Sequence, residues 1–102
     1  MYDSMKRRQL DLLWTAYQSS DDKPALVLNG PVAQAAGFVD AFGEAEYMRV
    51  LDMDTKGLLE DGAIVEAPEH RAAGLLDITP YWLTDEGRRM LHEAGYPIQL
   101  SR

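Results

Sequence analysis

The stretch "YWLTDEGRRMLHEAGYP", residues 81–97, decides the fold class. Two adjacent aromatic residues with strand character run directly into Thr84, which suits a helix N-cap because its hydroxyl can accept from a first-turn N–H group. The two carboxylates that follow lie where the helix dipole favours negative charge. Gly95 and Pro97 then end the helix. The stretch therefore predicts a strand that passes straight into a closing helix.

Two features of this closing helix predict its packing. Met90, Leu91 and Ala94 form its buried face. Gly87 is a poor helix former, costing about 1 kcal/mol relative to alanine. We therefore expect Gly87 where the helix backbone approaches the preceding strands or the first helix closely.

The segment before this stretch predicts two strands joined by a polar loop. Residues 58–59 and 63–65 form the first arm, and residues 75–83 form the second. Pro80 lies within the second arm and cannot donate to a sheet ladder. The second arm is therefore predicted at the edge of the sheet.

The N-terminal half predicts three helices and one short strand. Residues 4–20 form the first helix, with apolar side chains at helical spacing on one face: Leu10, Leu13, Trp14 and Tyr17. Residues 25–28 are a short apolar run between turn signals, which favours a strand. Residues 31–37 form a helix that begins at Pro31 and ends at Gly37.

The third helix is predicted over residues 43–56, after a tight connection at 38–43 that contributes two phenylalanines to the core. Gly57 is expected to end this helix in a left-handed cap. The complete order matches an α+β winged helix-turn-helix, with three N-terminal helices, a two- or three-stranded wing sheet and a C-terminal helix. Residues 1–102 are expected to form a single domain.

Three pieces of the chain resemble a known family in the right order: "MKRRQLDLLW", "EAEYMRVLDMDTKGLLEDG" and "LTDEGRRMLHEA". The chain is similar to short winged-helix proteins of unknown function from phages, prophages and bacteria. The last piece carries the Leu-Thr-x-x-Gly element that recurs in bacterial winged-helix proteins. The resemblance implies the fold and a phage or mobile-element origin, but no activity.

The composition excludes several kinds of chemistry. The 102 residues include no cysteine, so a disulfide, a thiol nucleophile and a Cys-ligated zinc are excluded. His70 and His92 have no partners at metal-ligand spacing, and paired carboxylates on turns usually face solvent. We therefore expect no enzyme, no cofactor and no metal site. The sequence shows no signal peptide or membrane span, so a cytoplasmic protein is expected.

The net charge of −7 and its placement argue against the usual partner of this fold. In a helix-turn-helix the second helix of the motif enters the DNA major groove, and lysine and arginine contact phosphates. Here residues 43–56 and the wing are acidic, so DNA is disfavoured. The alternative of a DNA-binding regulator stays open through five basic residues: Lys6, Arg7, Arg8, Arg49 and Arg71.

The leading hypothesis is a module that binds a basic, nucleic-acid-binding host protein, as an inhibitor or regulator. Its surface would combine acidic residues of the third helix and the wing with one exposed aromatic: Glu44, Glu46, Asp52, Asp54, Glu60, Asp61, Glu66, Glu69 and Tyr81. Tyr81 and Trp82 point to opposite faces of a strand, so one of them should be partly exposed. A purely solubilising role for the acidity and a homodimer both stay open.

Overall fold

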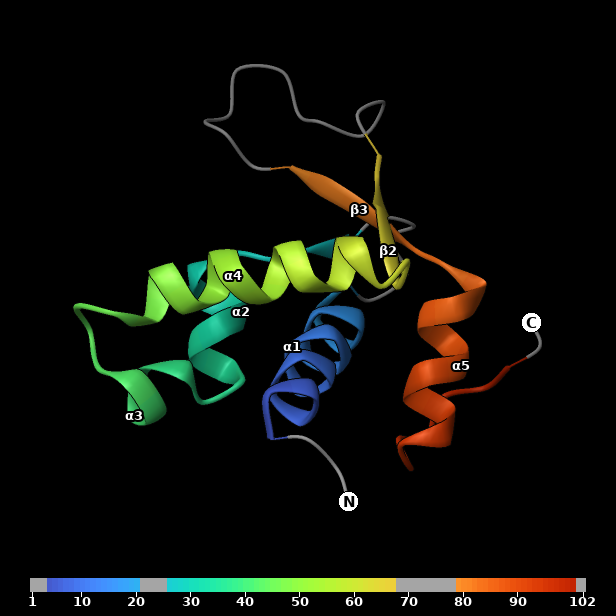
Figure 1. Cartoon of the computed structure of the whole chain (residues 1–102), viewed down its shortest axis with the longest axis horizontal. Helices are drawn as coiled ribbons and strands as arrows, with labels where there is room; N and C mark the ends of the chain where they lie inside the picture. The colour runs from blue at the N-terminus through green and yellow to red at the C-terminus, as the bar shows by residue number, and fades with distance from the viewer. Residues whose placement is uncertain (1–3, 21–25, 68–78, 101–102) are drawn as a thin grey trace.

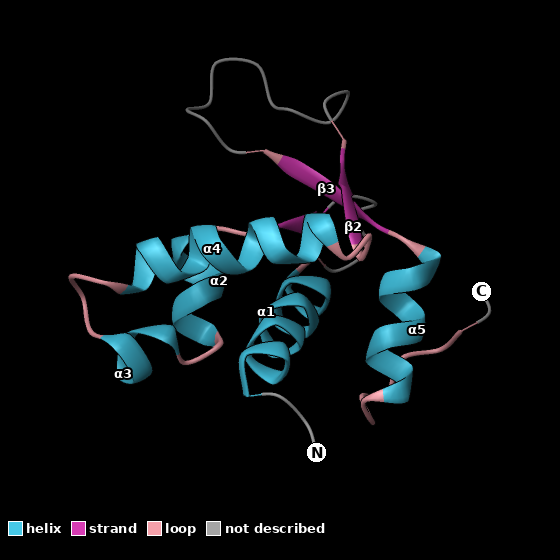
Figure 2. Cartoon of the chain, viewed as in Figure 1, coloured by secondary structure: helices cyan, strands magenta, loops and turns pink. Residues whose placement is uncertain are grey.

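The computed structural model describes residues 4–20, 26–67 and 79–100, which form five helices and a three-stranded antiparallel sheet (Figures 1 and 2). The elements follow in the order α1 (Ser4–Ser19), β1 (Leu26–Val27), α2 (Gly30–Ala35), α3 (Phe38–Phe42), α4 (Tyr47–Glu60), β2 (Ile64–Glu66), β3 (Pro80–Leu83) and α5 (Asp85–Glu93). The protein is therefore α+β, and this order is compatible with the predicted layout.

The sheet has the strand order β1-β3-β2, which places β3 in the centre. Val27 pairs with Pro80 on one side, and Val65 pairs with Trp82 on the other. The prediction that the proline-containing arm lies at an edge is wrong. Pro80 is tolerated because it is the first residue of its strand, where a missing N–H disturbs the ladder least. Its carbonyl still accepts from the N–H of Ala67 at 3.0 Å.

Helix α4 lies later in the chain than predicted, because it begins at Tyr47 rather than Gly43 and ends at Glu60 rather than Lys56. Residues 58–59, predicted as a strand, belong to the helix, and Leu58 is fully buried. Gly57 is an interior helical residue, while the left-handed conformation falls at Gly62, with φ of 76°. A Cβ at Gly57 would lie 2.6 Å from Nε2 of Gln9 on α1. Gly57 therefore permits close packing between the two helices, which the cap interpretation missed.

The predicted tight connection over residues 38–43 is itself a short helix, α3. Phe38 is buried, and its ring meets that of Phe42 edge to face at 5.8 Å. The preceding helix α2 is capped by Asn29, whose Oδ1 accepts from the N–H of Val32 at 3.1 Å. Gly37 follows this helix with φ of 90°, so the predicted stop is confirmed.

The junction between β3 and α5 confirms the prediction from residues 81–97. Thr84 is the N-cap, and its Oγ1 accepts from the N–H of Gly87 at 2.9 Å. A Cβ at Gly87 would collide with the carbonyl oxygen of Ala63 and come within 2.7 Å of Cδ1 of Leu83. The expected close approach of the helix to the strands is therefore present.

Helix α1 is the centre of the helical layer. In Figure 1 helix α4 crosses it on one side and α5 stands on the other. Leu10 and Leu13 are buried as predicted. Trp14 and Tyr17 are partly exposed and stack on each other with centroids 5.6 Å apart. This arrangement leaves one long face of α4 uncovered.

Candidate partner-binding surface

Helix α4 divides sharply into a buried and an exposed face. The buried residues are Val50, Leu51, Asp54, Thr55 and Leu58. The exposed residues are Met48, Arg49, Asp52, Met53, Lys56 and Glu60. We call this second set, together with Glu44 and Glu46 in the preceding turn, the α4 outer face.

The two cations of the α4 outer face are paired within the helix region itself. Arg49 lies 2.8 Å from a carboxylate oxygen of Glu46, and Lys56 lies 3.1 Å from one of Asp52. All four side chains are more than half exposed. Such pairs each contribute only about 0–1 kcal/mol to stability. A charged group of a partner can therefore replace either member of a pair at little cost in free energy.

Asp54 does not belong to the exposed surface, and its assignment to that surface was wrong. Its side chain is 1% exposed and accepts two hydrogen bonds from Arg8 of α1, from Nε at 2.6 Å and from Nη2 at 2.7 Å. The Arg8 guanidinium also lies 5.2 Å from the ring centroid of Phe42. The helical period places residue 54 inward, although its sequence neighbours at 52 and 53 point outward.

The other two basic residues at the start of α1 also contact groups of the protein itself. Lys6 forms an ion pair with Asp61, just beyond the C-terminal end of α4. Arg7 lies 3.6 Å from Asp11 and 4.7 Å from the ring centroid of Tyr96. Both residues are predicted phosphate contacts in the DNA interpretation, and each would have to leave an existing contact to serve as one.

The aromatic residue expected on the wing surface is not Tyr81. Tyr81 is 9% exposed, whereas Trp82 is partly exposed and pairs with Val65, which is 46% exposed. Alternation along the strand was anticipated, but the choice between the two aromatics was wrong. Tyr81 lines a groove together with Leu51 and Thr55 of α4, so its side of β3 faces the helix. Trp82 therefore points to the other side of the sheet.

The remaining carboxylates of the predicted surface lie at its two ends. Glu44 precedes α4, while Glu60 and Glu66 lie at the end of α4 and in β2. All three are exposed, and none forms an ion pair with another described residue. Glu69 and Arg71 lie outside the described residues.

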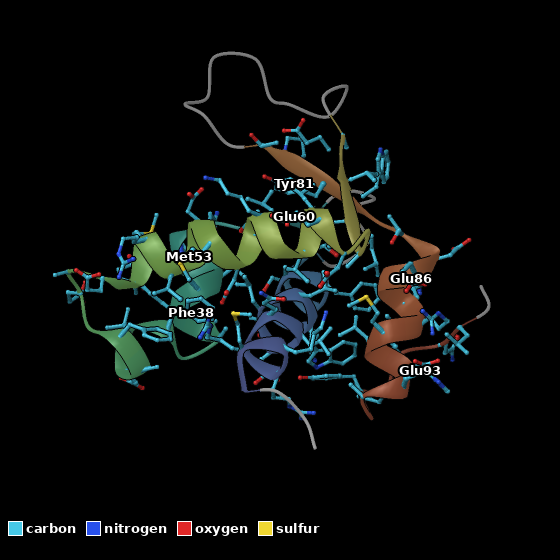
Figure 3. The ribbon with its side chains drawn as sticks, viewed as in Figure 1. Phe38, Met53, Glu60, Tyr81, Glu86 and Glu93 are labelled. Atoms are coloured by element: carbon cyan, nitrogen blue, oxygen red, sulfur yellow. The ribbon has the colours of Figure 1, made fainter. Side chains whose placement is uncertain are left out.

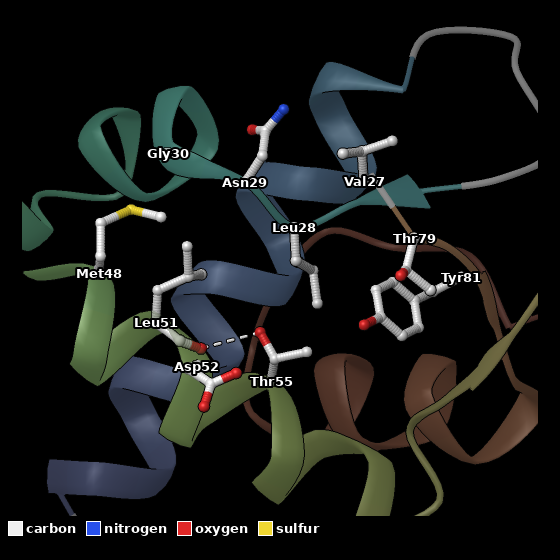
Figure 4. Close-up of a pocket in the computed structure, with 10 residues that line it drawn as sticks. All are labelled: Val27, Leu28, Asn29, Gly30, Met48, Leu51, Asp52, Thr55, Thr79 and Tyr81. Carbon is white, nitrogen blue, oxygen red and sulfur yellow. Dashed lines mark hydrogen bonds between the residues drawn. The ribbon is translucent and has the colours of Figure 1, made fainter. Parts of the chain in front are cut away.

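A groove runs along one side of α4 (Figure 4). It has a volume of about 320 Å³ and lies between α4, the segment from β1 to α2, and β3. Its described lining residues are Val27, Leu28, Asn29, Gly30, Met48, Leu51, Asp52, Thr55, Thr79 and Tyr81. Sequence reasoning missed it, because it forms only where three separate segments meet.

Within the described residues, no group of three histidine, cysteine or acidic residues is placed to hold a metal ion. His92 is exposed in the last turn of α5, and His70 lies outside the described residues. On the same helix, hydrogen bonds with Glu86 and then Glu93 raise the pKa of Arg89, so this cation stays charged.

Comparison of the chain with protein-family models, curated proteins and solved structures finds no match. Among the described residues, no helix is both long and apolar enough to cross a lipid bilayer. A functional assignment must therefore come from the surface itself.

Proposed function

We propose that this protein is a winged-helix interaction module that binds a basic protein through the α4 outer face and the adjacent wing. The element order and the strand order β1-β3-β2 support the winged-helix assignment. In such a domain α4 occupies the position of the DNA-reading helix, and β2 with β3 forms the wing. The function then depends on the chemistry that α4 and the wing present to a partner.

The charge arrangement of the α4 outer face is the observation that carries this proposal. Its two cations are paired with Glu46 and Asp52, while Glu44 and Glu60 add negative charge. A phosphate backbone would meet an excess of carboxylates, and phosphate contacts supply most non-specific affinity for DNA. Lysine and arginine side chains of a protein partner would instead be attracted.

Two methionines give the same face an apolar component. Met48 and Met53 are 50% and 48% exposed. Exposed methionine side chains are common on protein-binding surfaces because they are unbranched, polarizable and adaptable. Apolar contacts surrounded by charges are typical of a protein interface.

One observation favours DNA binding as a second candidate. Arg49 and Lys56 lie on the exposed face of α4, and their pairs with carboxylates are solvent-exposed. Both could exchange a carboxylate for a phosphate. DNA binding would make the protein a transcriptional regulator of the winged helix-turn-helix type, whereas protein binding would make it an inhibitor or regulator of a host protein.

Charge reversal separates the two functions. The double variant Glu44→Lys with Glu60→Lys adds positive charge at both ends of the α4 outer face. Glu93→Lys on α5 is a control for charge reversal outside the α4 outer face, because Glu93 is exposed and forms its ion pair with Arg89 of the same helix (Figure 3). Proteins retained from a bacterial lysate are compared for the wild type and both variants, alongside a mobility shift with mixed duplex DNA at low salt.

We expect the double variant to lose the retained proteins, the control to keep them, and the wild type to leave DNA unshifted. Retention that is unaffected by the double variant would contradict protein binding through this face. Retardation of DNA by the wild type, weakening steeply with added salt, would favour the regulator instead.

A further inference from the structure

The groove beside α4 has both apolar and polar walls. Met48 and Leu51 border it from the helix, and Leu28 and Tyr81 point toward the helix from the opposite side (Figure 4). Its volume of about 320 Å³ is at the lower end of the range of about 300–1,000 Å³ for ligand sites. One large side chain fits such a space, while a whole helix does not.

The groove carries a single charged side chain among its described lining residues. Asp52 is that residue, with its side chain 68% exposed, and its only described ion pair is the exposed one with Lys56. Thr55 also lines the groove, but its hydroxyl is neutral and donates to the carbonyl of Leu51 at 2.8 Å, so it offers a cation no charge comparable to that of Asp52. A group that binds here is therefore expected to combine an apolar body with a neighbouring positive charge.

We propose that the groove receives a large apolar side chain of a basic protein segment, and that an adjacent arginine or lysine of that segment pairs with Asp52. This inference rests on the proposed function and specifies the chemistry of the partner. The incoming cation replaces Lys56 beside Asp52, and this replacement costs little free energy because exposed ion pairs are weak. The net charge of −7 attracts such a segment from a distance.

The helix itself provides two matched pairs of positions for a test. Met48 and Met53 are equally exposed on α4, but only Met48 lines the groove. Asp52 and Glu46 each form an exposed ion pair with one cation, but only Asp52 lines the groove. All four side chains are exposed, so their substitution leaves the fold intact.

The probes are short fluorescein-labelled peptides in a glycine-serine background. The first has one tryptophan between two arginines, the second replaces the arginines by glutamates, and the third replaces the tryptophan by serine. Fluorescence anisotropy measures the Kd of each peptide for the wild type and for Met48→Ala, Met53→Ala, Asp52→Asn and Glu46→Gln.

We expect only the first peptide to bind the wild type. Met48→Ala should weaken the binding of this peptide about tenfold, because the peptide loses its apolar contact with the exposed half of the Met48 side chain. Asp52→Asn should weaken it about three- to fivefold. Met53→Ala and Glu46→Gln should weaken it clearly less than their counterparts, because neither side chain lines the groove.

The groove proposal would be overturned if both methionine variants, or both carboxylate variants, changed the Kd equally. It would also be overturned if the first peptide did not bind the wild type. These failures differ from a failure of the proposed function. If the groove is wrong but the proposed function holds, the Glu44 and Glu60 double variant still abolishes protein capture. Suppose instead that the double variant still captures the same proteins, while peptide binding depends on Met48 and Asp52. The groove proposal would then be supported, and the proposal that the broader acidic surface binds the partner would be contradicted.

Discussion

Asp52 and Asp54 lie two residues apart on the same helix, yet they belong to opposite parts of the molecule. Asp54 is buried against Arg8 of α1 and accepts two hydrogen bonds from it. Asp52 is 68% exposed and pairs with Lys56 one helical turn away. One carboxylate fixes the position of α4, and the other is available to a partner.

This contrast shows that the number of charged residues in a segment of the sequence does not give the number of charges that the segment exposes. The basic residues at the start of α1 contact acidic and aromatic groups of the protein itself, including Asp54 and Asp61. Those contacts remove cations from the surface along with carboxylates. Fewer carboxylates are therefore unpaired than the sequence indicates, although the net charge is unchanged. On the α4 outer face and β2, the carboxylates without an ion pair to another described residue are Glu44, Glu60 and Glu66.

We expect the largest effect on stability from a substitution of Asp54, the buried carboxylate of the two. Asp54→Asn removes the charge that faces Arg8, so the free energy of unfolding should fall by about 3 kcal/mol. Asp52→Asn is the matched control on the same helix. Urea denaturation measures both. Equal losses of stability for the two variants would contradict the division of α4 into a structural and an exposed face.

A second pair of variants extends the comparison to backbone packing. Gly87→Ala places a methyl group against the carbonyl of Ala63, so we expect a net loss of about 1–2 kcal/mol despite a better helix propensity. Gly57→Ala meets only the end of the Gln9 side chain, which can move, so its loss should be smaller. Thermal unfolding of both variants ranks them. A larger loss for Gly57→Ala would show that the α1–α4 contact is the less tolerant one.

The smallest effects should come from the exposed pairs. Glu46→Gln and Asp52→Asn should each change the free energy of unfolding by less than about 1 kcal/mol, and the change should shrink at high salt. Denaturation at low and high sodium chloride provides the measurement. A large, salt-insensitive loss for either variant would mean that its ion pair is structural.

The sequence predicted the parts of the fold that depend on local rules. The Thr84 cap, the Gly37 stop and the close approach at Gly87 each follow from the chemistry of one or two residues. The errors at Gly57 and Pro80 have a different origin. In both cases tertiary packing decided the outcome, through a neighbouring helix at Gly57 and the strand order at Pro80.

The candidate surface was predictable only in part for the same reason. Exposed acidic residues at both ends of α4 were expected, but the burial of Asp54 and Tyr81 depends on the rotation of α4 and the orientation of β3. The groove combines residues from β3, α4 and the β1–α2 segment. No spacing within a single segment signals such a site.

The central claim is that the α4 outer face and its groove select a basic protein segment over DNA. Fluorescence anisotropy at low salt tests it directly, with the arginine-flanked tryptophan peptide and a mixed-sequence duplex titrated separately against the same wild-type protein. We expect saturable binding of the peptide and none of the duplex. Saturable duplex binding that weakens steeply with added salt, without peptide binding, would contradict the account.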